Sequence, residues 1–281
     1  MKFWKMNGAG NDFVLINDME RVIPDDRLPA LARWLCERRL SLGADGLMVI
    51  RPAEQGGDFR MLFYNDDGSV GEMCGNGARC ICRYGWETGL AGRDAQRIET
   101  GAGLVTGYHV GGNNWRIRLN DPTVIELSHP VEIDGTVHDC SYVELGSPGS
   151  PHAVLAEDGL RDCDPEALLP LARALRYDPS FPKGANVSFY EIIGPNRVFL
   201  RTYERGVEDF TWACGTGTGS TVLTLVLKGF LDGGADADMR GGTLHVDVER
   251  EGTAIKSLWL SGPAAVSARG ELTYESISDI L

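Results

Sequence analysis

One local pattern occurs twice in the chain and limits how it can fold. In each half, a strand-like segment rich in Phe, Tyr or Leu leads through a polar loop to a cysteine, and glycines and an apolar run follow. The cysteines are Cys74, in GEMCGNGARC, and Cys214, in TWACGTGTGS, separated by about half of the 281 residues. A repeated supersecondary unit indicates an internal duplication. We therefore expect two similar halves, each with strands around a central helix.

The remaining elements are mostly short strands with Gly, Asn and Asp at the turns. Four segments carry helical spacing or helix start signals. Asp164 and Pro165 suit the cap and first turn of one of them, although Pro170 lies inside it. The expected helices are 26–39, 74–89, 164–177 and 214–229. The expected strands are 13–17, 46–51, 58–65, 115–120, 141–145, 152–156, 186–193, 198–204, 244–249 and 257–261.

Composition excludes several kinds of partner and location. A formal net charge of −13 argues against nucleic acid or an anionic membrane surface. No apolar run approaches the roughly 18 residues of a membrane span, and the start lacks the features of a secretory signal. The 7 cysteines are odd in number and scattered, which favours reduced thiols over a disulfide framework. We expect a cytoplasmic protein.

The position of the two glycine-flanked cysteines predicts chemistry. A helix N-terminus stabilises a thiolate, and its N–H groups can hold a carboxylate that glycines allow to approach closely. Two such sites suggest opposite sides of one substrate, where one sulfur removes an α-proton and the other delivers a proton to the far face. The helix N-termini would stabilise the intermediate carbanion. No cofactor is needed. The other cysteines are expected to be small buried hydrophobes: Cys36, Cys80, Cys82, Cys140 and Cys163.

Other classes of function are weaker. The spacing of Cys74, Cys80 and Cys82 is poor for zinc, so no metal site is expected. Neither GAGNDF nor GTGTGS has the features of a dinucleotide or phosphate loop. A dithiol redox protein stays open, because two facing thiols can form a disulfide. A binding module without chemistry is a third option.

Six motifs follow one another over most of the chain: KMNGAGNDF, LGADGL, FYNDDGSVGEMCGNGARC, PHAV, FPKGANVSF and RTYERGVEDFTWACGTGTG. In this order they resemble the motifs of the diaminopimelate epimerase family. The resemblance implies an α+β fold of two similar domains, each a barrel-like, mostly antiparallel sheet around a central helix. We expect domains at 1–120 and 121–262, with the tail 263–281 returning to the first and the boundary near 120–130. The implied reaction is cofactor-independent inversion of LL-diaminopimelate to its meso form by two cysteines.

The resemblance also implies residue roles. Cys74 and Cys214 correspond to the acid/base pair, Glu204 can influence Cys214, and His152 corresponds to a histidine that tunes the other cysteine. Arg205 suits a bidentate grip on a carboxylate. Ser150 is a further candidate. The implied substrate-binding residues are Asn11, Asn65, Gly75, Asn76, Asn186, Glu204, Arg205, Gly215 and Thr216. Asparagine suits a zwitterionic amino acid because its amide both donates and accepts hydrogen bonds.

Four positions depart from common family patterns. Ser150 stands where many members have Asn, and Gly46 where some have Gln. Phe210 and Trp212 lie near the second cysteine, where smaller or more polar residues are usual. They either pack the core or reshape the pocket, so a racemase for histidine or another polar amino acid is the alternative. The expected partner is a small amino-acid substrate, and a homodimer is one option for the assembly.

Overall fold

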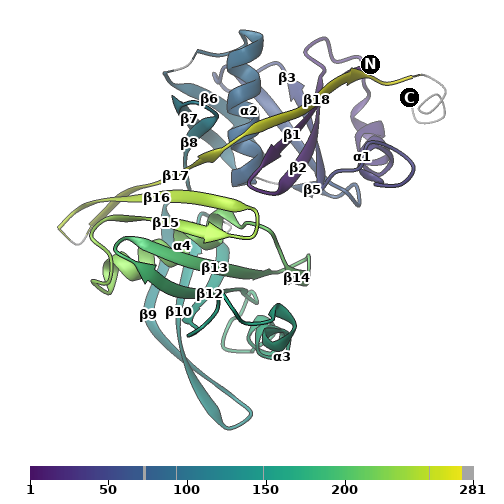
Figure 1. Ribbon diagram of the computed structural model, residues 1–281. Helices are drawn as coiled ribbons and strands as arrows, with labels where there is room; N and C mark the ends of the chain where they lie inside the picture. Colours follow the sequence, from purple (N-terminus) through teal and green to yellow (C-terminus); the bar gives the residue numbers. More distant parts are fainter. Residues whose placement is uncertain (72–73, 93, 148, 253, 274–281) are drawn as a thin grey trace. The chain divides into compact units, whose positions relative to one another are not determined.

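The computed structural model describes residues 1–71, 74–92, 94–147, 149–252 and 254–273 (Figure 1). The chain forms two compact units. The N-terminal unit comprises Met1–Ile117 with Gly262–Leu281, and the C-terminal unit comprises Arg118–Ser261. Of the tail expected to return to the first domain, residues 274–281 lie outside the described part of the chain.

The N-terminal unit is a mostly antiparallel sheet wrapped around one helix, α2 (Gly75–Thr88). Its strands are β1 (Lys2–Gly8), β2 (Asn11–Asn17), β3 (Gly46–Arg51), β4 (Phe59–Asn65), β5 (Val70–Gly71), β6 (Gln96–Thr100), β7 (Gly103–Gly111), β8 (Asn114–Arg118) and β18 (Ala265–Glu271). Helix α1 (Leu28–Cys36), preceded by the short η1 (Asp25–Arg27), connects β2 to β3. The C-terminal strand β18, yellow in Figure 1, lies beside the purple β1 and is antiparallel to it.

The C-terminal unit repeats this plan around α4 (Gly215–Leu227). Its strands are β9 (Pro122–Ile133), β10 (Thr136–Leu145), β11 (Ser150–Ala156), β12 (Asn186–Gly194), β13 (Arg197–Glu204), β14 (Asp209–Phe210), β15 (Gly234–Met239), β16 (Gly242–Glu251) and β17 (Ala254–Pro263). Helix α3 (Pro165–Arg176) connects β11 to β12, and the exposed Pro170 does not interrupt it. Strand β9 occupies most of the region 120–130, where we expected the boundary.

The two sheets correspond pair by pair. In the N-terminal unit the order β18, β1, β2, β3, β4 continues through β6 to β7 and β8. In the C-terminal unit the order β9, β10, β11, β12, β13 continues through β15 to β16 and β17. The parallel pairs fall at equivalent places, β2 with β3 and β4 with β6 in one, β11 with β12 and β13 with β15 in the other. The predicted duplication is therefore confirmed.

The central helices follow from their sequences. Helix α4 is apolar on nearly every side, and a helix of that kind is stable only when it is buried all round. Glycines let both helices approach their sheets closely. A Cβ at Gly77 of α2 would meet the Met48 side chain at 2.0 Å, and one at Gly217 of α4 would meet Thr202 Oγ1 at 2.8 Å. These contacts place the start of each helix against its own sheet. Among the described residues, no helix is long and apolar enough to span a bilayer.

Candidate active site

Cys74 is the N-cap residue of α2. Its backbone is extended, with φ −122° and ψ 121°, and its carbonyl accepts a 2.8 Å hydrogen bond from the N–H of Ala78. The partly buried Sγ donates to Oδ1 of Asn11 at 3.3 Å, so the start of β2 contacts the start of α2. Gly75 and Asn76 follow in the first turn and are buried. Backbone N–H groups at the start of a helix are a ready anion site.

A buried cation that was not among the sequence candidates lies in the next turn of α2. Arg79 is fully buried. It donates to the carbonyl of Gly75 at 3.3 Å, to Oδ1 of Asn76 at 2.9 Å and to the carbonyl of Pro263 at 3.4 Å. Burial lowers the pKa of Arg79 to about 10. This value is still well above 7, so the guanidinium is charged at neutral pH. The signal in the sequence was an arginine within an otherwise apolar face of a glycine-flanked helix.

Asn65 and Gly46 lie opposite each other, at the end of β4 and the start of β3. The amide of Asn65 donates to Oγ of Ser69 at 2.9 Å and so closes the turn after β4. A Cβ at Gly46 would meet the ring of Phe63 at 2.5 Å and the carbonyl of Tyr64 at 2.8 Å. The space that a longer side chain would need at position 46 is therefore filled by Phe63.

Cys214 caps α4 as Cys74 caps α2. Its backbone is also extended, with φ −116° and ψ 113°, and its Sγ accepts from the N–H of Gly217 at 3.3 Å. Thr216 Oγ1 lies 3.5 Å from the same sulfur, and Gly215 is buried. Only 6% of Cys214 is exposed. Burial raises the pKa of its thiol well above the ordinary value, and the negative charge of Glu204 adds to this.

A buried polar chain connects Cys214 to the sheet. His152 is fully buried, with Nε2 at 3.0 Å from Thr216 Oγ1 and Nδ1 at 3.3 Å from Ser188 Oγ. Ser188 continues to Thr202 at 3.2 Å. Burial, aided by the positive charge of Arg205, lowers the pKa of His152 to about 3, so its ring is neutral. Ser150 Oγ reaches both partners, Nε2 of His152 at 3.4 Å and Oγ1 of Thr216 at 3.5 Å.

Ser188 and Thr202 were not among our candidates. They occupy inward positions on β12 and β13, where strand alternation alone would place apolar side chains. Polar residues at such positions were the available signal. The predicted role of His152 was to tune the cysteine other than Cys214, whereas its hydrogen bonds connect it through Thr216 to Cys214.

The remaining candidates form a second cluster in the C-terminal unit. Asn186 is buried, and it accepts from the N–H of Arg205 at 2.8 Å and donates to the carbonyl of Pro151 at 2.9 Å. The exposed guanidinium of Arg205 donates to the carbonyl of Lys183 at 2.8 Å. A carboxylate oxygen of Glu204 accepts from the hydroxyl of Thr211. Asn186 thus fixes the backbone at Arg205.

The two aromatic departures differ from each other. Phe210 packs into the core against Phe189 and Tyr203, with ring centroids at 6.1 and 5.7 Å. Trp212 is 49% exposed, and the guanidinium carbon of Arg240 lies 4.1 Å from its ring centre. Phe210 is therefore a partly buried residue that packs against the core, whereas Trp212 shapes the surface two residues before Cys214.

Each unit thus presents a cysteine at the N-cap of its central helix, beside backbone N–H groups suited to an anion. Among the described residues, no group of three or more His, Cys, Asp or Glu side chains is placed to hold a metal ion.

Solved structures with this fold include an epimerase, a probable racemase and a phenazine biosynthesis protein. A hydroxyproline epimerase from Agrobacterium vitis matches with a TM-score of 0.66 at 15% identity, covering 96% of this chain and 91% of its own. A probable proline racemase from Agrobacterium radiobacter gives a TM-score of 0.70 at 16% identity, covering 97% and 92%. A phenazine biosynthesis protein from Bacillus anthracis gives 0.71 at 13% identity, covering 97% and 99%. These likenesses show that the chain has the fold that the three proteins share.

Sequence comparison narrows this fold to one family. The diaminopimelate epimerase profile matches residues 3–121 and 146–266. A diaminopimelate epimerase from Heliobacterium modesticaldum is 33% identical over 287 residues, covering 97% of this chain and 99% of its own. One from Archaeoglobus fulgidus is 35% identical over 258 residues, covering 89% and 90%. The chain belongs to the diaminopimelate epimerase family, a family of isomerases.

Proposed function

We propose that the protein inverts an amino-acid α-carbon without a cofactor, using Cys74 and Cys214 as an acid/base pair. The observation that carries this proposal is the equivalence of the two cysteines, each the N-cap of the central helix in one of two duplicated units. The substrate that the family favours is LL-diaminopimelate, with the meso isomer as product. This places the enzyme in lysine and cell-wall precursor synthesis, and the thiol chemistry suits the cytoplasm.

The chemistry is two proton transfers with no change of oxidation state. One sulfur, as thiolate, takes the α-proton, so an S–H bond forms while the C–H bond breaks and its electron pair stays on the carbon. The other sulfur, as thiol, gives its proton to the opposite face. The first turns of α2 and α4 would hold the α-carboxylate through the N–H groups of Gly75, Asn76, Gly215 and Thr216. In the reverse direction the two sulfurs exchange roles.

The C-terminal unit supplies a way to move the proton of Cys214. Its raised pKa makes it a thiol at neutral pH, so it needs an acceptor before it can act as a base. Glu204 is the neighbouring carboxylate that interacts with this thiol. Neutral His152 orients Thr216, whose hydroxyl faces the sulfur. We propose Glu204 as the proton acceptor, with His152 and Thr216 holding the geometry.

The distal end of the substrate is assigned to the remaining family positions. Asn65, Asn186, Glu204 and Arg205 would bind its amino and carboxyl groups, with Asn11 and the candidate Ser150 nearer the cysteines. A second candidate is a racemase of the same mechanism for another polar amino acid. It is favoured because Phe63 fills the space that a longer side chain at position 46 would need. The two share the catalytic residues and differ only in substrate.

An exchange experiment in deuterated water tests the chemistry and the substrate together. LL-diaminopimelate and the common L-amino acids are incubated with the enzyme, and deuterium at the α-carbon is measured by mass spectrometry. We expect incorporation with LL-diaminopimelate, and a loss of at least about 100-fold in Cys74→Ala and in Cys214→Ala. Cys163→Ala, a cysteine outside both helix caps, is the matched control. Full activity in either cap variant refutes the two-base scheme, and disulfide turnover without exchange would support a dithiol redox protein.

A further inference from the structure

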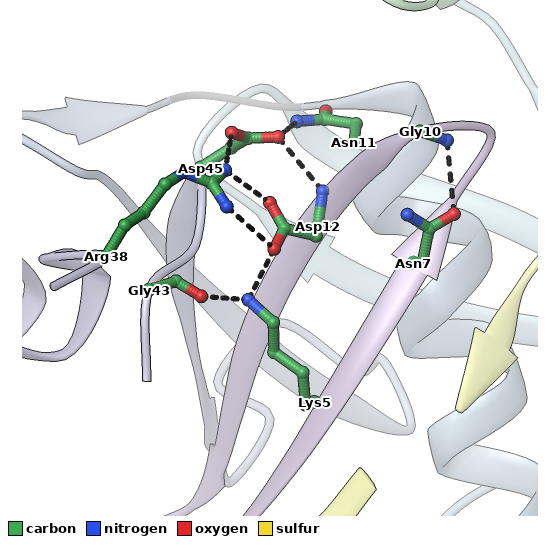
Figure 2. Close-up of polar contacts among 8 residues, drawn as sticks. All are labelled: Lys5, Asn7, Gly10, Asn11, Asp12, Arg38, Gly43 and Asp45. Atoms are coloured by element: carbon green, nitrogen blue, oxygen red, sulfur yellow. Dashed lines mark hydrogen bonds and ion pairs between the residues drawn. The ribbon is translucent and has the colours of Figure 1, made fainter. Parts of the chain in front are cut away.

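We propose that Asp45 is a positioning residue that fixes the side-chain amide of Asn11, so that the carbonyl oxygen of Asn11 accepts the thiol proton of Cys74. The network around Asp45 is drawn in Figure 2. The importance of Asp45 for catalysis rests on the proposed function, in which Cys74 must alternate between thiol and thiolate. The effect of Asp45 on the Cys74 thiol does not depend on that function.

The orientation follows from the hydrogen-bonding capacity of a carboxylate. Oδ2 of Asp45 lies 2.5 Å from Nδ2 of Asn11 and accepts from the N–H of Asp12 at 3.0 Å. An ionised carboxylate can only accept, so the amide of Asn11 must turn its NH2 group toward Asp45. Its oxygen then faces the other way and lies 3.3 Å from Sγ of Cys74. An amide turned by 180° would bring two acceptors together at Asp45.

Asp45 is itself held by a charged network. Arg38 bridges the two carboxylates, at 2.6 Å from Asp45 and 2.8 Å from Asp12 (Figure 2). Lys5 lies 2.5 Å from Asp12 and also donates to the carbonyl of Gly43. Burial opposes ionisation of Asp12, but its hydrogen bonds to Arg38 and Lys5 outweigh that effect and hold its pKa below the ordinary value. Asp12 therefore stays ionised beside Arg38, while Asp45 is held directly by Arg38 and by the backbone N–H of Asp12.

A fixed acceptor beside a sulfur favours the thiol over the thiolate. Asn11 can stabilise the S–H group of Cys74, but it cannot turn an N–H toward the negatively charged sulfur while Asp45 holds it. Two charged groups, one on α2 and one directly before β3, act on Cys74 in opposite directions. Buried Arg79 favours the thiolate, whereas Asp45, acting through Asn11, favours the thiol. Asp45 thus helps Cys74 keep its proton until substrate is in place.

The C-terminal unit has no such fixed polarity at the equivalent position. The registers of β2 with β3 and of β11 with β12 make Ser150 the counterpart of Asn11. A hydroxyl can rotate to donate or to accept, so it responds to the state of its neighbours. The locked amide therefore distinguishes the Cys74 side from the Cys214 side.

The test measures alkylation of Cys74 by iodoacetamide at pH 7, with the modified peptide followed by mass spectrometry. Only the thiolate reacts, so the rate reports the thiolate fraction. In Asp45→Ala the amide of Asn11 is free to turn its N–H toward the sulfur, and we expect the rate to rise about 3- to 10-fold, the size of one net hydrogen bond. Asp12→Asn breaks the ion pairs with Lys5 and Arg38 but leaves the bond between Asn11 and Asp45, and it should change the rate less than 2-fold.

A second comparison separates positioning from a general structural effect. In an Asn11→Ala background, Asp45→Ala should add nothing to the alkylation rate, because Asp45 acts only through Asn11. An unchanged rate in Asp45→Ala, or a rise that persists without Asn11, overturns the proposal. Asp45→Asn is the second variant if Asp45→Ala does not fold. Alkylation needs no turnover, so these outcomes are independent of whether the substrate assignment is correct.

Discussion

The two units have the same backbone plan but different chemistry behind their cysteines. By strand register, Phe13, Met48 and Phe63 in the N-terminal unit are equivalent to His152, Ser188 and Thr202 in the C-terminal unit. The first set is apolar and the second is a hydrogen-bonded chain. The duplicated fold keeps a helix N-terminus at each cysteine, while the side chains of the sheet behind the helix are apolar in one unit and polar in the other.

The charged residues near the two cysteines also differ between the units. Five residues after Cys74 stands the buried Arg79, whereas five residues after Cys214 stands Gly219, against which Leu119 packs. Glu204 brings negative charge to Cys214. A duplicated fold can therefore give its two thiols different tendencies to ionise by placing opposite charges near them, here at positions that are not equivalent in the two units.

The largest expected effect of this difference is on the pH dependence of stability. The pKa of His152 is about 3 in the folded protein and near 6.5 in the unfolded chain. The unfolded state therefore binds more protons between these values, so stability is complete above pH 6.5 and falls as the pH decreases toward 3. As the pH falls from 6.5 to 4.5, we expect the proton uptake of His152 in the unfolded chain to lower the free energy of unfolding by roughly 2 to 3 kcal/mol.

Urea unfolding of wild type and His152→Gln at both pH values measures that contribution, which the variant should lack. His245→Gln is the control of opposite sign. Burial opposes protonation of His245, but Asp236 and Asp247 outweigh it and raise its pKa, so its contribution is lost as pH rises. An identical pH dependence in wild type and His152→Gln would show that the buried polar chain does not exclude the charged ring.

A smaller effect on stability is expected at Gly46, where the apolar side chain of Phe63 fills the neighbouring space. In Gly46→Ala the new Cβ meets the ring of Phe63 and the carbonyl of Tyr64, so we expect a loss of about 1 to 3 kcal/mol in the free energy of unfolding. Gly233→Ala, where nothing lies within 4 Å of the added Cβ, is the control and should change little. Phe63→Leu should recover part of the loss when combined with Gly46→Ala. Strict additivity in urea unfolding would mean that Phe63 does not occupy this space.

The smallest effect concerns the two connecting helices. Asp164 caps α3 by accepting from the N–H of Glu166 at 3.1 Å, whereas Arg27 caps α1 without a side-chain hydrogen bond. Asp164→Ala should therefore lower the free energy of unfolding by about 1 kcal/mol, and Arg27→Ala should leave it nearly unchanged. Thermal unfolding of the two variants provides the comparison. Equal losses would show that the cap bond contributes nothing to the difference between these helices.

Local patterns predicted the duplicated frame well. The glycine-flanked cysteines marked the starts of α2 and α4, and the Asp164-Pro165 pair marked α3. Strands such as β15 and β18 were missed because GADADM and AVSARGE contain few of the β-branched and aromatic residues that favour strands, and long-range pairing decides their state. The hydrogen-bond partners of Arg79 and the polar residues bonded to His152 could not be predicted from the sequence either. They depend on contacts between residues distant in sequence, which spacing along the chain cannot reveal.

The pairing of β18 with β1 affects how the chain can fold during its synthesis. The C-terminal unit is one uninterrupted stretch, Arg118–Ser261, and can assemble as soon as it leaves the ribosome. The N-terminal unit, although made first, waits with the edge of β1 uncovered until the last part of the chain arrives. Order of synthesis and order of completion are thus reversed, and a premature stop before Ala265 would leave the earlier half without its closing strand.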